Sequence, residues 1–389
     1  MERGRLDTDV FVVGGGPAGL AAAIAARQEG FRVRVADCGA PPLEDECGEG
    51  LLPAGVMALR KLGVTVGLND GMPFRGLRFA ENRIAAQADF PDGWGRGIRR
   101  MTLHKLLLER AWRVGVQMNW NVRVRCGQSD TLYADDGQVR SRWVIGADGH
   151  NSRVRNWAGL GADFAGTKRY GLRRQYRVTP WSDRVEVHWS SKCQMRVTPT
   201  GSSGVCVTAL TINRKLQFDE ALPRFRELAA RLAGAEIISN EMSEVPASRS
   251  LSGVFRGNVA LTGDASNGVD AITGDGLTLA MQQGLSLAHA LRKKDLREYA
   301  REHRQMMQRP RMMSRMMVLL NEHGWLRRRL LSALSANPMM FSRLLAAHAG
   351  TMNLTRLVLD YAPEFTWEVL TAHDAASSSE IGSSRFDQQ

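Results

Sequence analysis

Residues 9–19 read DVFVVGGGPAG, and this stretch decides the fold. A short apolar run ends at Val13 and is followed at once by Gly14, Gly16 and Gly19, in the spacing G-x-G-x-x-G. The first glycine permits a tight turn, the second lets the backbone approach a pyrophosphate, and the third lets a helix pack closely on a strand. The free N–H groups at the start of that helix would face the diphosphate. The stretch therefore predicts a dinucleotide-binding loop.

The residues that follow complete a βαβ unit. The loop continues through Pro17 and Ala18 into a helical pattern, and residues 31–37, FRVRVAD, form the next strand. About 30 residues is the length that such a unit requires. Asp37 ends the second strand, where it is placed to accept a hydrogen bond from a ribose hydroxyl, and Cys38 comes directly after it. Strand, helix, strand and acid occur in the expected order, which strengthens the prediction of dinucleotide binding.

Two later apolar strands also end in an Asp next to a Gly. Residues 256–266, RGNVALTGDAS, reach Gly263 and Asp264, and residues 141–155, SRWVIGADGHNSRVR, reach Asp148. A carboxylate at such a strand end can accept from a ribityl hydroxyl of a flavin, whereas a nicotinamide dinucleotide has no ribityl chain. A lone Asp-Gly turn is common, but these two turns and the glycine-rich loop, each after an apolar strand of one α/β domain, together indicate FAD as the cofactor.

GGGPAG, GADGHNSRVR and LTGDAS resemble the three flavin motifs of the FAD-dependent aromatic hydroxylases, the group A flavin monooxygenases. Their superfamily includes flavin-dependent halogenases and geranylgeranyl reductases. The resemblance covers residues 9 to about 300 and implies the same cofactor and fold. It implies that Asp264 binds the ribityl chain, that Arg100, at the head of R-x-x-L-H, lies near the flavin, and that the backbone of Val124 contacts adenine.

Two further segments resemble loops beside the flavin ring. Residues 47–51, CGEGL, are similar to a loop of the reductase branch, which assigns to the flavin site Gly48, Glu49, Gly50 and Leu51. A second Gly-Asp pair opens a helix, and its N-terminal N–H groups and dipole would lie beside the flavin pyrimidine, where reduced flavin is negatively charged. The residues concerned are Gly274, Asp275, Gly276 and Leu277. We expect the Asp275 side chain to cap this helix.

The pattern along the chain predicts an α/β fold: a Rossmann-like FAD-binding domain with an inserted, mostly antiparallel β-sheet substrate domain and a helical C-terminus. We predict a discontinuous FAD-binding domain in residues 1–75, 98–168 and 255–300, and a substrate domain in 76–97 and 169–254. A C-terminal helical region would span 301–372, and the polar, Ser-rich tail 373–389 is typical of disorder.

The positive charge is concentrated near the C-terminus. The net charge is +12, and residues 292–350 carry 13 Lys or Arg against 4 Asp or Glu. Arg alternates there with Met and Leu, which favours amphipathic helices over a nucleic-acid surface. These helices would form either a packed cap or a face for peripheral contact with an anionic membrane. The N-terminus lacks a signal-peptide pattern, and the five cysteines lack metal-like spacing, so we expect a cytoplasmic protein without a metal.

The residues that act on the substrate are not identified by any motif. A phenol hydroxylase needs a base or cation that favours phenolate, and the candidates to face the substrate are His188, Asp270 and Tyr176. The alternatives are that His188 is an ordinary strand residue and that Asp270 caps a loop. The catalytic residues therefore stay unassigned.

Our first hypothesis for the reaction is hydroxylation of a lipophilic aromatic or polyketide-like molecule through a flavin hydroperoxide, with NAD(P)H as electron donor. The alternative is reduction of prenyl or polyene double bonds, which CGEGL and ITGDG favour. Residues 266–274, SNGVDAITG, depart from the hydroxylase pattern, because Asn267 stands near the expected His and residues 270–273 occupy the Pro region. The W-x-W-x-I-P motif of halogenases is absent. A non-catalytic flavin-containing partner is the third class.

Overall fold

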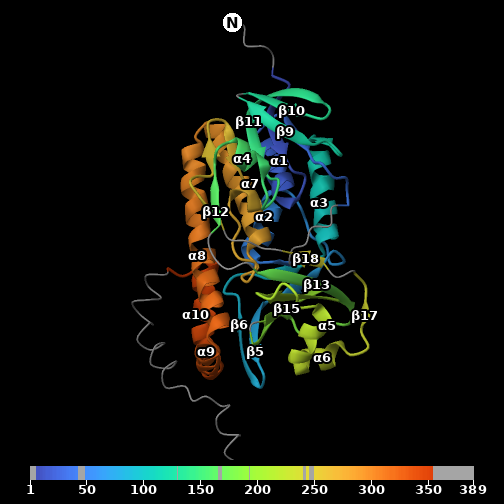
Figure 1. Cartoon of the computed structure of the whole chain (residues 1–389), viewed down its shortest axis with the longest axis vertical. Coiled ribbons are helices and arrows are strands. Elements are labelled where there is room, and N and C mark those ends of the chain that lie inside the picture. The colour runs from blue at the N-terminus through green and yellow to red at the C-terminus, as the bar shows by residue number, and fades with distance from the viewer. Residues whose placement is uncertain are drawn as a thin grey trace, which may run out of the picture.

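The computed structural model describes residues 6–42, 49–128, 130–164, 169–191, 193–239, 242–244 and 249–353. Gly48 and the predicted tail 373–389 lie outside the described residues. Figure 1 shows two sheets, one above the other, with a long helix along one side. The predicted fold class, a Rossmann-like α/β domain with a mostly antiparallel sheet domain and a helical C-terminal region, is confirmed.

The upper sheet has a parallel core. Its strands follow the order β20 (Phe255–Arg256), β21 (Val259–Leu261), β11 (Gly137–Gly146), β1 (Thr8–Val13), β2 (Val33–Ala36) and β8 (Gln117–Asn119). Strands β10 (Thr131–Ala134) and β9 (Val124–Gln128) extend it from β11. β1 pairs in parallel with both β2 and β11, and β11 pairs in parallel with β21. Three chain segments therefore build one sheet, as the discontinuous-domain prediction requires.

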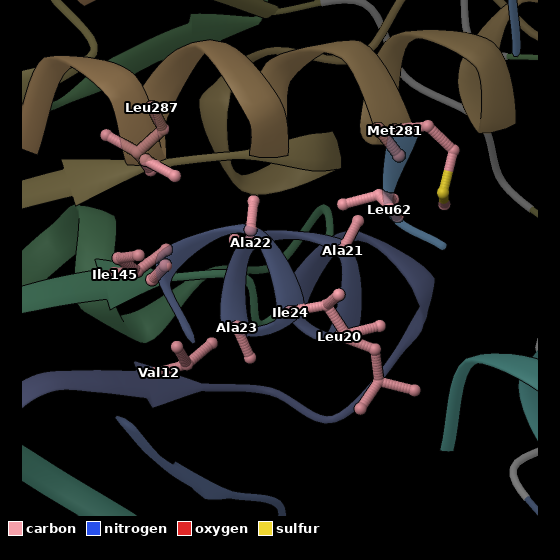
Figure 2. Packing of buried hydrophobic residues seen from close by; sticks show 14 of the residues in the cluster. Val12, Leu20, Ala21, Ala22, Ala23, Ile24, Leu62, Ile145, Met281 and Leu287 are labelled. Carbon is pink, nitrogen blue, oxygen red and sulfur yellow. The ribbon is translucent and has the colours of Figure 1, made fainter. Parts of the chain in front are cut away.

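Helices α1 (Pro17–Gln28), α2 (Pro53–Lys61), α3 (Arg100–Arg113), α4 (Arg153–Trp157) and α7 (Gly276–Lys293) belong to this half. Helices α1 and α7 pack closely because Gly284 of α7 has no side chain. A Cβ at Gly284 would lie only 2.8 Å from the backbone nitrogen of Ala22 in α1. Figure 2 shows α1 between β1, which carries Val12, and α7, which carries Met281 and Leu287. These side chains belong to one buried apolar cluster that holds the glycine-rich loop in place.

The lower sheet is mostly antiparallel. Its order is β17 (Glu236–Ile237), β13 (Tyr170–Arg177), β16 (Gly204–Thr211), β15 (Cys193–Gly201), β14 (Arg184–Ser190), β5 (Gly76–Glu81) and β6 (Ile84–Asp89), and β18 (Met242–Glu244) also pairs with β13. β14 and β5 are parallel. Helices α5 (Phe218–Ala221) and α6 (Arg226–Leu232) pack with it, separated by the 3-10 turn η1 (Leu222–Arg224).

Small sheets join the two halves. One consists of β3 (Gly50–Leu51), β7 (Gly95–Gly97) and β4 (Met72–Phe74), and another of β12 (Ala162–Phe164) and β19 (Arg249–Leu251). The chain between α3 and β10 forms two separate strands, β8 and β9. Asn121 lies between them with φ +58°, a left-handed conformation that Asn adopts more readily than most residues and that no strand continues through.

The C-terminal helices form a cap across both halves. α8 (Leu296–Glu322) begins beside α7, and α9 (Gly324–Ala336) and α10 (Pro338–Ala349) pack on β5 and β6 (Figure 1). The predicted domain boundary at 300/301 falls inside α8. Arg327 of α9 forms a buried, bidentate ion pair with Glu81 of β5, with nitrogen–oxygen distances of 2.6 and 2.8 Å. This pair fixes the cap to the lower sheet.

The Met- and Leu-rich side of the cap is buried, as the packed-cap alternative predicts. Met317, Leu331 and Met340 belong to one apolar cluster with Phe79 and Trp189 of the lower sheet. Membrane contact through the opposite side of these helices stays a prediction. Among the described residues, no helix combines the length and apolar character needed to cross a membrane.

Candidate flavin site and substrate cavity

The glycine-rich loop leaves no room for side chains. Gly14 has φ +110°, and a Cβ there would lie 2.3 Å from the carbonyl oxygen of Ala147. At Gly19 a Cβ would lie 1.9 Å from the carbonyl oxygen of Gly14. The start of α1 is thereby pressed against the end of β11, with Gly16 at its N-cap and Pro17 as its first residue. The N-cap of α1 therefore carries no side chain, which suits diphosphate binding at a helix N-terminus.

Asp37 lies beside this loop. Its carboxylate accepts from the backbone N–H of Gly15 at 2.6 Å and from that of Gly39 at 2.7 Å. Cys38, between them in the chain, is an exposed free thiol. His104 of α3 contacts the carbonyl oxygen of Gly15 through Nε2 at 2.9 Å. The R-x-x-L-H motif thus reaches the glycine-rich loop through its histidine.

Val124 begins β9, where its side chain is buried against Leu132 in the cluster around Val13. The chain just before it runs beside the end of β2, since the N–H of Val122 donates to the carbonyl oxygen of Asp37 at 2.8 Å. The backbone near Val124 therefore lies beside the predicted ribose site.

The two glycine motifs meet in space. Gly263 has φ +60°, and a Cβ there would lie 2.6 Å from Cβ of Ala18. Asp264 follows in the 3-10 turn η2 (Gly263–Ser266), where it is exposed and lines a cavity. The acid predicted to bind the ribityl chain is therefore held next to the start of α1.

Buried polar side chains of α7 and α8 hold the η2 turn in place, and the sequence did not predict these contacts. Gln283 of α7 accepts from the N–H of Gly263 at 2.8 Å, and His303 of α8 contacts the hydroxyl of Ser266 at 2.9 Å. Tyr299 donates to the carbonyl oxygen of Leu261 at 2.7 Å. Burial lowers the pKa of His303 to about 4 and Arg311 adds to the effect, so the ring is neutral at pH 7.

We predict that the folded protein loses stability in mild acid because the buried ring of His303 must then take up a proton. The folded-state pKa of about 4 lies below the ordinary value of 6.5. The stability that depends on the neutral ring is therefore full above about pH 6.5 and is lost as the pH falls toward 4, by at most about 3 kcal/mol. The free energy of unfolding should be measured across this range in the wild type and in His303→Gln, whose side chain does not titrate. The wild type should lose more stability; equal losses would contradict the prediction.

Asp148 has a structural task. Its carboxylate accepts from the hydroxyl of Ser152 and from the N–H groups of Arg153 and Val154, at 2.5 to 3.1 Å, and so stabilises the start of α4. Arg155 of the same helix is buried and donates to the carbonyl oxygen of Ala265 at 3.2 Å. The GADGHNSRVR motif therefore orders the turn that carries Asp264 through its last residue, Arg155, for which the sequence predicted no role.

Glu49 turns away from the cavity that its neighbour Gly50 lines. Its buried carboxylate accepts from the side chain of Gln175 and from the N–H of Arg100 at 3.2 Å, and lies 3.5 Å from Nη1 of Arg173. Burial raises its pKa, which these partners only partly offset. Leu51 is fully buried in the core. Glu49 and Leu51 thus hold the CGEGL loop in place, and Gly50 faces the cavity.

The start of α7 differs from the prediction in one respect. Gly274, Gly276 and Leu277 line the cavity, as their assignment to the flavin ring requires. Asp275 occupies the N-cap position, but its side chain makes no capping hydrogen bond. Instead Oδ1 lies 3.1 Å from Nε2 of His348, on α10, in a pair that is almost entirely buried. The expected cap is wrong, because a histidine 73 residues later competes for the carboxylate.

One large cavity extends from these loops between the lower sheet and the cap. Its volume is about 1650 Å³, including its opening to solvent. The end at the flavin loops is lined by Gly50, His150, Arg196, Asp264, Gly274, Gly276, Leu277 and His348. The rest is mostly apolar and includes Phe74, Leu77, Phe79, Phe90, Val185, Val187, Leu210, Met313, Met316, Met317, Leu330, Leu334, Phe341, Leu344 and Leu345. The cavity is polar at one end and can hold a long apolar group.

The three candidates to face the substrate do not line this cavity. On β14, Val185 and Val187 face it, whereas His188 lies on the other side of the strand with Nε2 2.9 Å from Glu186. Tyr176 packs against Phe218 in the core beneath the sheet. A substrate bound in the cavity would not contact His188 or Tyr176, because both residues belong to the opposite face of the sheet.

Asp270 is engaged in a buried ion pair. Its carboxylate accepts from Nε of Arg169 at 2.7 Å and from the N–H of Ile272 at 3.1 Å. It therefore holds the loop before α7, as the loop-cap alternative predicts, and it does not itself line the cavity.

These features fit FAD. Side chains at Gly14 and Gly19 would fill the space of the glycine-rich loop, and α1 begins after a glycine N-cap. Asp37 lies beside this loop, and Asp264 lines the cavity. A model of the FAD binding domain family matches residues 7–305. The chain belongs to this family. It is an FAD-dependent oxidoreductase.

Relatives and solved structures agree with the assignment. The chain is 28% identical over 319 residues to menaquinone reductase of Mycobacterium tuberculosis, covering 74% of this chain and 77% of that one. It is 26% identical over 309 residues to digeranylgeranylglycerophospholipid reductase 1 of Methanococcoides burtonii, covering 71% and 72%. In fold it is similar to a flavoprotein/dehydrogenase from Cytophaga hutchinsonii, with a TM-score of 0.79, 20% identity, and 93% and 99% of the two chains covered.

Asp264 offers a direct test of the site. Asp264→Ala removes the carboxylate predicted to accept from the ribityl chain, and FAD affinity should fall about 10- to 100-fold, the usual effect of losing a hydrogen bond to a charged group. FAD occupancy and the dissociation constant measure it. Asp92→Ala removes an exposed acid in another turn and should leave both unchanged. Full FAD occupancy in Asp264→Ala would contradict the assignment.

Proposed function

We propose that the protein is an FAD-dependent reductase of carbon–carbon double bonds in the isoprenoid chain of a lipophilic substrate. The observation that carries the proposal is the cavity, whose long apolar part opens onto the flavin loops. The similarity to two reductases, one named for menaquinone and one for a geranylgeranyl lipid, supports it. CGEGL and ITGDG pointed to the same branch.

The residues of the chain would bind and orient the substrate. Leucine, methionine and phenylalanine side chains of the cap and the sheet would surround an isoprenoid chain and exclude water, a favourable burial of apolar surface. Gly50 and Gly276, which lack side chains, leave space at the reacting end. When bound, FAD supplies two electrons to the substrate, and we propose NAD(P)H as their source.

Hydroxylation fits the cavity less well. That hypothesis placed a base or cation for phenolate formation at His188, Asp270 or Tyr176, and each of these lies away from the cavity. The long apolar part of the lining favours a substrate with an isoprenoid chain.

The test is turnover in the strict absence of oxygen. With NAD(P)H and a prenylated quinone or a geranylgeranyl lipid, we expect NAD(P)H oxidation that is stimulated by the lipid and a product whose isoprenoid chain has gained two hydrogen atoms, as distinct from a quinone ring reduced to the quinol. The matched incubation in air serves as the comparison. A product that appears only in air and carries an added oxygen atom would establish hydroxylation instead.

A further inference from the structure

The Asp275–His348 pair has no place in the proposed function so far. Both side chains are nearly inaccessible, with 4% and 9% of their surface exposed, and Nε2 of His348 lies 3.1 Å from Oδ1 of Asp275. His348 lines the cavity at the end where Gly274 and Gly276 also lie. It belongs to α10, outside residues 7–305 that match the family.

An acid at this position works against the cofactor. The start of α7 carries the positive end of the helix dipole, which would favour the negatively charged, reduced form of a flavin bound beside it. A lone carboxylate at Asp275 would cancel that field. A protonated His348 in contact with the carboxylate restores it, because the charge of the pair is then zero.

The charges around the pair favour the protonated ring. Burial alone would lower the pKa of His348, but the carboxylate of Asp275 outweighs burial and raises it above the ordinary value; Arg309 of α8 opposes this. Burial alone would raise the pKa of Asp275, but His348 and, more weakly, Arg196 of β15 outweigh it. Arg196 also lies at Gly274, where a Cβ would be 2.4 Å from its Nη1.

We propose that His348 is a positioning residue of the flavin site: its protonated ring neutralises Asp275 and thereby favours the reduced form of FAD. The C-terminal cap then completes the cofactor site as well as the substrate cavity. The compensation is present at neutral and lower pH and is lost as the pH rises and the ring loses its proton.

The test is the midpoint potential of bound FAD in the purified holoenzyme, measured without substrate at about pH 6 and at higher pH. In His348→Gln we expect a roughly tenfold less favourable reduction at the lower pH, which is about 30 mV for two electrons. The difference from the wild type should vanish at the higher pH. A constant difference, or none at either pH, would overturn the proposal.

A second variant changes the charge in the other direction. Asp275→Asn removes the carboxylate, and the buried ring of His348 then has no charge to hold its proton, so at the lower pH we expect a midpoint potential close to that of the wild type. At the higher pH the wild-type carboxylate is no longer neutralised, and the midpoint potential of the variant should lie above that of the wild type. This variant also carries the test if His348→Gln fails to retain FAD. A potential in Asp275→Asn that is unchanged or lowered at the higher pH would overturn the proposal.

The control is the same histidine-to-glutamine change at a site away from the pair. His289→Gln removes a partly exposed histidine near the end of α7, where it lies 4.0 Å from Glu29, and leaves Asp275 and His348 in place. Its midpoint potential should equal that of the wild type, and an equal shift in this variant would overturn the proposal. Because no substrate is present, failure of double-bond reduction would leave this test unaffected.

Discussion

Replacing Gly19 by alanine should give a protein that does not retain FAD. The new Cβ would lie 1.9 Å from the carbonyl oxygen of Gly14 and 3.3 Å from Cβ of Ala147, so backbone rather than a flexible side chain must move. Moving α1 away from the end of β11 breaks the diphosphate cradle and costs about 1–3 kcal/mol or more of stability, as overpacking does.

The measurements are the flavin absorbance of the purified protein and its free energy of unfolding. Gly161→Ala is the matched control, because a Cβ there would have no atom within 4 Å and the backbone φ is not positive. The control should retain FAD and stability. A Gly19→Ala protein with full FAD occupancy would show that α1 does not need this contact to bind the cofactor.

The second large effect is expected at Arg327. Arg327→Met leaves Glu81 buried without its partner and removes the hydrogen bond to the carbonyl oxygen of Leu320. Breaking a buried ion pair in this way costs about 3–5 kcal/mol. We expect a matching loss in the free energy of unfolding, together with faster hydrogen exchange in α9 and α10.

Two comparisons isolate the buried pair. Glu81→Leu combined with Arg327→Met replaces both charges by apolar groups and should recover part of the stability, since no buried charge is left unpaired. Arg231→Met breaks a pair with Glu227 in which both side chains are about two-fifths exposed, and should cost at most about 1 kcal/mol. Equal losses in Arg327→Met and Arg231→Met would contradict the role of Arg327 in fixing the cap.

Local patterns were sufficient for the fold. The G-x-G-x-x-G loop after an apolar strand, and the apolar strands that end at Asp148 and Asp264, predicted one discontinuous sheet, and β1, β11 and β21 pair in parallel as that prediction requires. Each of these signals is contained in a few consecutive residues, so local backbone geometry connects it to structure.

Which face of the lower sheet borders the cavity could not be predicted in the same way. Successive side chains of a strand point to opposite sides, and His188 and Trp189 of β14 do so. Which side borders the cavity depends on the cap, whose helices come more than 100 residues later. Val185 and Val187 gave no chemical signal that they, rather than His188, would face the substrate.

The other omissions have a common cause. Arg155, His303 and His348 act on residues 110, 37 and 73 positions away in the chain, respectively. A single sequence has no pattern that reports such pairings. The one available signal was charge: an acid in the flavin-proximal Gly-Asp-Gly of α7 requires a partner when it is buried.

The proposed reaction is tested most directly by a single turnover without oxygen. The enzyme is reduced under strict anaerobic conditions, freed of excess reductant and mixed with a prenylated quinone or a geranylgeranyl lipid. We predict that the oxidised-flavin absorbance returns on mixing and that one double bond of the lipid chain is lost for each flavin reoxidised. A flavin that stays reduced until oxygen is admitted, with the lipid chain unchanged before that point, would contradict the account.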